Sequence, residues 1–430
     1  MLRLYLLFLT LLISIEVSAL DLPTRKIEDD SSLRITILNS WLTGKIDQVL
    51  AQKPVTYTLS GGGRVQVRAE AGTNTVRIIL ARERNGSYPG WVQGSWILSR
   101  RRNSGTIEHI TVFLRSDPNL YVRFRPFNTD KCVMDVLVYG AYLLQNLTLP
   151  FSIERLMVLP VEEVLAAAKT QFPRRYFESE PALYRDLRVF ISQVRSRLPE
   201  VQFGDDGAID ASGRYVFIND LRPQEGDGGL NCSGFAKWLV DGILRPFTGT
   251  RLSIPPLKKP FGERGNSTTD AFERLRDPFF GLDWTRNLAS IANATILSYQ
   301  DIGQLSEIEV QKCPFTKLTA SSGNDGIRSY PNYLKDAGFS FDGIEPLLYT
   351  LAVDEPGYVY LSSVNNDGGS PSMRTHFHVA ALVPYFDEEG DFHVTVFESA
   401  EETSFNTFKK RYPGHFFNLV RIPVEGLFDP

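Results

Sequence analysis

The sequence predicts an α+β protein in which a mainly β N-terminal region precedes a second region of mixed helices and strands. Short runs that alternate apolar and polar residues fill positions 32–155, and Gly, Pro, Asn and Asp separate them. Apolar residues at helical spacing follow in residues 159–200. Beyond them an apolar helix comes first and long apolar strands come last. A chain of 430 residues also exceeds one ordinary domain.

Residues 1–19 have the pattern of a secretory signal peptide. Arg3 supplies a positive start, Leu4–Ile15 an apolar core, and Val17–Ala19 a small-residue cleavage site. The alternative is an uncleaved membrane anchor, but Glu16 and the short apolar length count against it. We therefore expect an exported protein, periplasmic or extracellular, with no transmembrane segment after signal removal. The oligomeric state is not indicated.

Residues 20–158 are expected to form the mainly β domain. Apolar and polar residues alternate from Val55 to Leu59 and again from Val65, with Gly61–Gly63 between the two runs. This pattern predicts a hairpin. Further runs predict strands and a sandwich or barrel; they are 75–81, 91–98, 107–114, 120–127 and 133–144. The many arginines here indicate either a solvated sheet face or a surface that docks an anionic polymer.

Residues 159–200 are expected to be a helical bridge, and residues 201–430 the second domain, with a long insert at 248–346. A structureless insert of this length is improbable, so it should fold against something. We expect it to form one wall of, or a lid over, the site described next. The alternative is a remote stabilising appendage.

The most informative stretch is Asn231–Phe235, with the sequence NCSGF, which follows Gly228-Gly229 and precedes an apolar run. This order predicts that a flexible loop delivers Cys232 to the first turn of a helix. Free N–H groups and the helix dipole lower a thiol's pKa there, which makes it a nucleophile. Further on, residues 375–383 read as a strand that carries His376 and His378, both candidate bases on one strand face.

A third residue must accept the other imidazole N–H of the base. The hairpin from His378 through the turn at 387–391 places Glu398 or Ser399 opposite that histidine. Glu398 is the one charge in an otherwise apolar strand, and a carboxylate stabilises an imidazolium. His393, on the returning strand, is the alternative third residue.

Four segments in order resemble the NlpC-type cell-wall cysteine peptidases, which have a papain-like fold. NCSGF is similar to that family's DCSGF; residues 355–361 resemble its PGDLVFF strand, His378-Val379-Ala380 its HVG strand, and residues 397–400 its IHAS or IEA strand. The likeness favours His378 over His376 as the base. It also makes Tyr215 a candidate, because tyrosines upstream of the cysteine often flank it in the family. Asn231 stands for the usual Asp, and cysteine and histidine lie much further apart than usual.

The resemblance implies an exported cysteine peptidase or amidase that hydrolyses amide bonds in peptidoglycan peptides through Cys232, His378 and Glu398. Two other functions stay open: a thiol acyltransferase or lipid-ester enzyme on the same fold, and a catalytically inactive binding protein. The net charge of −4 argues against nucleic acid as a partner. No HExxH, paired CxxC or phosphate loop occurs, so no metal or cofactor is predicted. Cys132 and Cys313 either pair or are small buried residues.

Overall fold

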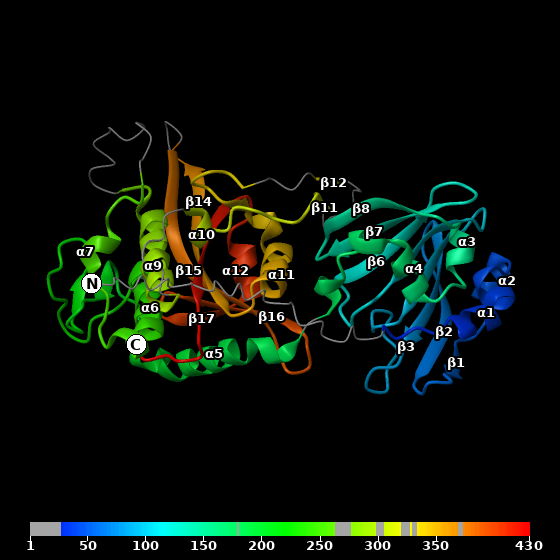
Figure 1. The fold of residues 1–430 in the computed structure, drawn as a ribbon, viewed down its shortest axis with the longest axis horizontal. Coiled ribbons are helices and arrows are strands. Elements are labelled where there is room, and N and C mark those ends of the chain that lie inside the picture. The colour runs from blue at the N-terminus through cyan, green and yellow to red at the C-terminus, as the bar shows by residue number, and fades with distance from the viewer. Residues whose placement is uncertain are drawn as a thin grey trace, which may run out of the picture.

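The computed structural model describes residues 27–178, 180–262, 277–297, 305–319, 327–328, 333–368 and 373–430. The predicted signal peptide, residues 1–19, lies outside them. Helix and strand each take up 32% of the chain, and the N-terminal region is mainly β, which is compatible with the predicted α+β class. Two lobes lie side by side, one formed by the N-terminal region and one by the C-terminal region (Figure 1).

The N-terminal lobe is built on one antiparallel meander in which each strand pairs with the next along the chain. Its strands are β1 (Val55–Thr58), β2 (Arg64–Ala71), β3 (Thr75–Arg82), β4 (Trp96–Arg101), β5 (Ile107–Val112), β6 (Leu120–Pro126), β7 (Cys132–Val138) and β8 (Ala141–Leu149). Four short helices accompany it: α1 (Ser31–Thr36), α2 (Ile46–Leu50), α3 (Ile153–Leu156) and α4 (Val161–Ala167). Alternate strand residues such as Val67, Ile78 and Val122 form its core.

Two expectations for this lobe are wrong. The apolar run 133–144 is not one strand but the hairpin β7–β8, which turns at Tyr139-Gly140. Both residues have positive φ, 47° and 82°, as a two-residue hairpin turn requires. The strands also form a single sheet with β1 at one edge and β12 (Ile327–Arg328) at the other, whereas a sandwich would have two packed sheets and a closed barrel would have no edge strand.

The arginines of this sheet mostly have acidic partners close by. Arg123 and Arg125 both pair with Asp135, at 3.3 and 2.9 Å, and that carboxylate is fully buried. Arg82 pairs with Glu28. This local neutralisation favours the interpretation of a solvated sheet face over that of a surface for an anionic polymer.

The C-terminal lobe contains a six-stranded antiparallel sheet in the order β13-β18-β14-β15-β16-β17. Its strands are β13 (Phe339–Ser340), β14 (Tyr358–Gly368), β15 (Met373–Phe386), β16 (Phe392–Glu398), β17 (Glu401–Ser404) and β18 (Phe416–Pro423). A two-stranded ribbon, β9 (Gly207–Ile209) with β10 (Tyr215–Phe217), precedes it along the chain. The long apolar stretches of β14 and β18 are buried because helices cover them.

The helices of this lobe pack on the sheet. α6 (Cys232–Thr248) contacts β15, while α9 (Phe280–Ile296) contacts α6 and strands β14, β15 and β18. α11 (Ile344–Asp354) lies toward the N-terminal lobe (Figure 1), as its Tyr349 shows by contacting Tyr139 with ring centroids 5.4 Å apart. The remaining helices are α5 (Arg185–Arg197), α7 (Ile254–Leu257), α10 (Leu305–Ile308) and α12 (Phe405–Arg411).

The expected insert connects the two lobes. Its strands β11 (Lys317–Thr319) and β12 (Ile327–Arg328) extend the N-terminal sheet beyond β8, with Leu318 opposite Ala141. The chain then returns to the C-terminal sheet through β13. Residues of the second lobe thus supply an edge of the first.

All three cysteines are free thiols. Cys132 is buried in the N-terminal sheet, and burial raises its pKa to about 12. Cys313 is partly buried, and burial raises its pKa as well. Both environments disfavour the thiolate, in contrast to that of Cys232 below.

Candidate active site

Cys232 is the first residue of α6, and the local sequence explains this position. The side chain of Asn231 caps the helix, because its Oδ1 accepts the N–H of Gly234 at 2.8 Å. Gly234 is required by close packing: a Cβ there would lie 1.9 Å from the carbonyl oxygen of Gly207 in β9. Capping and packing together fix the start of the helix, so the half-buried thiol of Cys232 opens into a cavity.

His378 on β15 contacts this thiol. Its Nε2 lies 2.6 Å from Oε2 of Glu398 at the end of β16. Since Nε2 is engaged there, Nδ1 is the nitrogen available to Cys232, with which His378 forms a side-chain hydrogen bond. The structure therefore brings Cys232, His378 and Glu398 together, with the imidazole between the thiol and the carboxylate.

The charged forms of these three side chains stabilise one another. Burial by itself raises the pKa of the Cys232 thiol, but the hydrogen bond and charge of His378 and the N–H of Val379 outweigh it, and the pKa is lowered. Burial by itself lowers the pKa of His378, but Cys232 and Glu398 together raise it to about 9. A lowered thiol pKa beside a raised imidazole pKa favours a thiolate–imidazolium pair at neutral pH.

Glu398 is almost fully buried, with its side chain 1% exposed, yet it is charged. Burial raises its pKa, but the hydrogen bond to His378, then Thr403 and Arg411, lower it below the usual range. Arg411, the last residue of α12, donates from Nη1 to Oε1 of Glu398 at 2.7 Å. One carboxylate oxygen thus faces the imidazole and the other faces a guanidinium, which holds the carboxylate in place.

The pairing of β15 with β16 shows how Glu398 reaches His378. Ala381 lies opposite Phe397, so Glu398 is in line with Ala380 and not with His378 as expected. Glu398 and His378 are therefore diagonal neighbours on one sheet face, a spacing that long side chains bridge. The turn that follows, Ser399-Ala400, has positive φ at both residues (49° and 67°) and begins β17.

The start of α6 also supplies a hydrogen-bond donor that could bind an oxyanion. As the first helical residue, Cys232 has a backbone N–H with no acceptor within the helix. This free donor and the positive end of the helix dipole lie beside the sulfur, where they can stabilise negative charge.

His376, the alternative base, lies in the same cavity wall but has a different role. Its Nε2 lies 2.9 Å from the carbonyl oxygen of Asp336, which accepts its N–H, and its Nδ1 lies 2.9 Å from the hydroxyl of Ser363. Burial lowers its pKa to about 3, so the ring stays neutral. With both nitrogens bonded to groups of the fold, His376 has none left for the thiol.

The structure does not bring the other two candidates to Cys232. His393 pairs across the sheet with Tyr385, and its Nε2 lies 2.7 Å from Asp387 in the hairpin turn. Tyr215 on β10 packs against Gly228, where a Cβ would lie 2.4 Å from its own Cβ. Tyr215 therefore supports the loop that leads to the nucleophile and is not among the residues that line the cavity.

The cavity has a volume of about 520 Å³ and is mostly polar around its rim. The polar groups come from Asp206, Asn219, Lys258 and Asp277, in addition to Asn231, Cys232, Ser233 and the two histidines. Phe280 and Phe377, together with Ile218 and Val379, form the apolar part.

Residues of the expected insert form one side of this cavity. Lys258, Asp277, Phe280 and Gly281 line it, and α9 is fixed to the nucleophile helix. The indole N–H of Trp284, itself fully buried, donates to the carbonyl oxygen of Ser233 at 2.8 Å. This contact one residue from the nucleophile makes α9 a fixed wall of the site.

Sequence reasoning missed three residues of this arrangement. Arg411 is the last residue of a short helix with no recognisable pattern, and Trp284 carries no signal beyond its helical surroundings. Lys258 lies just after Pro255-Pro256, which marks a turn but not a site. Their roles depend on contacts between segments far apart in the chain, and no local pattern encodes such contacts.

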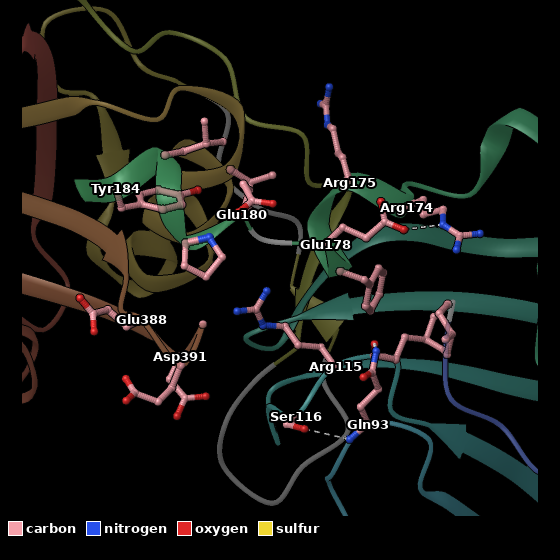
Figure 2. A pocket seen from close by; sticks show the side chains of 18 residues that line it. Gln93, Arg115, Ser116, Arg174, Arg175, Glu178, Glu180, Tyr184, Glu388 and Asp391 are labelled. Carbon is pink, nitrogen blue, oxygen red and sulfur yellow. Dashed lines mark hydrogen bonds and ion pairs between the residues drawn. The ribbon is translucent and has the colours of Figure 1, made fainter. Parts of the chain in front are cut away.

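A second, larger cavity of about 630 Å³ lies between the two lobes (Figure 2). Arg115 extends into it from the loop between β5 and β6, and Glu388 and Asp391 of the β15–β16 turn lie on the other side. The guanidinium of Arg115 lies 4.5 Å from the ring centre of Phe386. None of the lining residues is a cysteine or a histidine, so the pair described above has no counterpart there.

The described ranges also contain neither a candidate membrane span nor a candidate metal site. None of the helices there is both long and apolar enough to cross a membrane. Nor does any group of three His, Cys, Asp or Glu side chains in those ranges form a potential metal site.

Comparison with protein families matches residues 23–176 to a family described as "Domain of unknown function (DUF8515)". The match covers the N-terminal sheet and its helices and ends before Asp206, the first residue of the Cys232 cavity. Searches of curated proteins and of solved structures found no match to the chain.

Proposed function

We propose that this protein is an exported cysteine peptidase or amidase of the papain-like, NlpC-type class, which hydrolyses amide bonds in cell-wall peptides. The observation that carries the proposal is the hydrogen-bonded line of Cys232, His378 and Glu398, with the thiol at a helix N-terminus. The resemblance of four segments in order to the NlpC-type peptidases supports the choice of substrate.

In the first half of the reaction the Cys232 thiolate attacks the carbonyl carbon of the amide. The carbonyl oxygen becomes negative and is stabilised by the N–H of Cys232. His378, held as an imidazolium by Glu398, donates its proton to the amide nitrogen. The C–N bond breaks, the amine leaves, and a thioester on Cys232 remains.

In the second half, neutral His378 removes a proton from a water molecule that attacks the thioester carbon. The C–S bond breaks, the carboxylic acid leaves, and the sulfur takes up the thiolate form beside the newly charged imidazolium. Glu398 stabilises that positive charge in both halves, and its contact with Nε2 keeps Nδ1 directed at the sulfur.

The lining of the cavity supports peptides over long acyl chains as substrates. Asp206, Asn219, Lys258 and Asp277 provide hydrogen-bonding groups that a peptide can use. A lipid-ester enzyme needs a deep apolar channel, and only Phe280 and Phe377 contribute large apolar surface here. The lowered pKa of Cys232 also speaks for an enzyme over an inactive binding protein.

The test is to incubate the purified protein with muropeptides and identify the products by mass. We expect peptide fragments whose summed mass exceeds the substrate by one water. Cys232→Ala should abolish them, whereas Cys313→Ala, the matched control at a thiol with a raised pKa, should not. Cleavage that persists in Cys232→Ala would contradict the proposed nucleophile.

A further inference from the structure

We propose that Lys258 forms an anion-binding subsite in the Cys232 cavity, so that the preferred substrate carries a carboxylate close to the bond that is cleaved. The inference rests on the proposed function, because it assigns a substrate class to the same site. It concerns a residue of the insert, outside the segments that resemble the NlpC-type peptidases.

The ammonium of Lys258 is held in a fixed place. Its Nζ donates to the carbonyl oxygen of Ile218 at 3.0 Å and to that of Asn219 at 2.8 Å. An ammonium has three N–H groups, so one remains for a ligand. No carboxylate in the described part of the chain forms an ion pair with it, and Lys258 is the one Lys or Arg among the described residues that line the cavity.

The backbone at Lys258 is equally well fixed. Asn287 of α9 donates from Nδ2 to the carbonyl oxygen of Leu257 at 3.0 Å and to that of Lys259 at 2.8 Å, on either side of Lys258. Leu257 is fully buried and anchors α7. A charged group preorganised in this way loses little conformational entropy when it binds an anion.

The two aspartates of the cavity already serve the fold. Oδ2 of Asp206 accepts the N–H of Asn219 at 3.1 Å, and Oδ1 of Asp277 accepts the N–H of Phe279 at 3.0 Å, just before α9. Lys258 differs from them because its third N–H has no acceptor among the residues that the structure describes. The starts of α6 and α9 line the same cavity and add positive potential to it.

The test compares the alkylation of Cys232 by iodoacetate, which is anionic, with that by iodoacetamide, which is neutral. In both reactions the thiolate attacks the methylene carbon, a C–S bond forms, and iodide leaves. The ratio of the two rates cancels changes in the thiolate fraction, because both reagents react with the same thiolate. The labelled Cys232 peptide is quantified by mass spectrometry in wild type, Lys258→Met, Lys258→Arg and Lys259→Met.

We expect Lys258→Met to lower the iodoacetate-to-iodoacetamide ratio about tenfold, in the range of electrostatic effects in charged clefts. Lys258→Arg should keep the ratio because it keeps the charge. Lys259→Met removes a charge one residue away, where the side chain is exposed, and should also keep it. A ratio that is unchanged in Lys258→Met, or that falls equally in Lys259→Met, would overturn the proposal.

A matched pair of peptide amides links the subsite to turnover. One peptide has a free carboxylate beside the cleaved bond, and the other has a carboxamide in its place. Lys258→Met should lower kcat/KM for the first by a larger factor than for the second; equal losses for both would count against the subsite. Alkylation needs no turnover, so the two proposals can fail separately. If the alkylation ratio depends on Lys258 but no peptide is hydrolysed, only the proposed hydrolase is wrong. If peptides are hydrolysed but the alkylation ratio is the same in Lys258→Met as in wild type, only the subsite is wrong.

Discussion

His376 and His378 lie two residues apart on β15 and line the same cavity, yet their surroundings differ in every respect that matters to an imidazole. His378 has a thiol on one side and a charged carboxylate on the other, and its pKa is raised to about 9. His376 has a hydroxyl and a backbone carbonyl, and burial lowers its pKa to about 3. The comparison teaches that burial and the partners of the two ring nitrogens, and not the strand position, decide which histidine is a charged imidazolium.

The charged side chains near the two rings increase this difference in pKa. Arg286 and Arg374 act on His376 and further disfavour its protonated form. Arg411 is also close to His378, but Glu398 lies between them and reverses the effect. The Cys232 thiol and the buried Glu398 carboxylate, which His376 lacks, thus separate a ring that can act as an acid from one that remains neutral.

The largest expected effect comes from replacing each histidine in turn. His378→Ala should reduce kcat by about 10²–10⁴-fold, because the acid and base of both half-reactions is lost. His376→Ala should keep most of the activity per folded molecule but lower stability by about 1–3 kcal/mol, because buried partners lose their hydrogen bonds. Amide hydrolysis and thermal unfolding of both variants measure the two effects. A dead but stable His376→Ala would reverse the assignment.

The dependence of the rate on pH sharpens the comparison. The raised pKa of His378 means that its charged form persists up to about pH 9, and the lowered pKa of Cys232 means that the thiolate exists below the usual thiol range. The rate should therefore rise on an acid limb set by Cys232, stay high between the two, and fall about tenfold per pH unit above about 9. An alkaline limb near pH 6.5 would contradict the pairing of His378 with Glu398.

Removing only the charge of Glu398 should have a smaller effect. In Glu398→Gln an amide oxygen can still accept the imidazole N–H, but the imidazolium loses its counter-ion. We expect kcat/KM to fall about tenfold, the factor of one pKa unit, and the alkaline limb to move to lower pH. His393→Gln serves as the control, since that ring contacts Asp387 and not the site. A larger loss in the control would transfer the role of third residue to His393.

The smallest effect is expected for Arg411, which we assign as a positioning residue. Its side chain is 40% exposed, and ion pairs of this kind contribute up to about 1 kcal/mol. Arg411→Met should lower kcat/KM no more than about fivefold and move the alkaline limb only slightly. Arg411→Lys should restore part of the loss. If neither the rate nor the pH profile changes, Arg411 is only a surface contact.

Local patterns in the sequence were sufficient for the parts of the site that depend on one segment. Cys232 at a helix start follows from the loop, cap and apolar run around it, and the strands of both histidines and of Glu398 follow from alternation and turns. The residue that lies opposite Glu398 does not follow from these patterns, because a shift of the strand register by one residue changes the neighbour across the sheet. Choosing between His376 and His378 needed the resemblance, since their different surroundings come from Asp336 and Ser363, distant in the chain.

In the N-terminal lobe the turn at Tyr139-Gly140 was not predicted. The residues on either side of this turn are as apolar as those of the strands, so the whole segment reads as one strand. The pairing of β11 with β8 was not foreseen for a different reason. Edge pairing depends on backbone hydrogen bonds, which almost any residue can make, so three residues such as Lys317–Thr319 carry no signature of their partner.

That pairing has a consequence for anyone who divides the protein into fragments. A fragment that begins at residue 201 would carry β11 and β12 without β8, and one that ends at residue 178 would carry β8 without β11. Each half would expose unpaired strand edges, and such edges promote self-association. The boundary suggested by the helical bridge is therefore a poor site for expression of separate halves, and co-expressed halves should reassemble through the shared sheet.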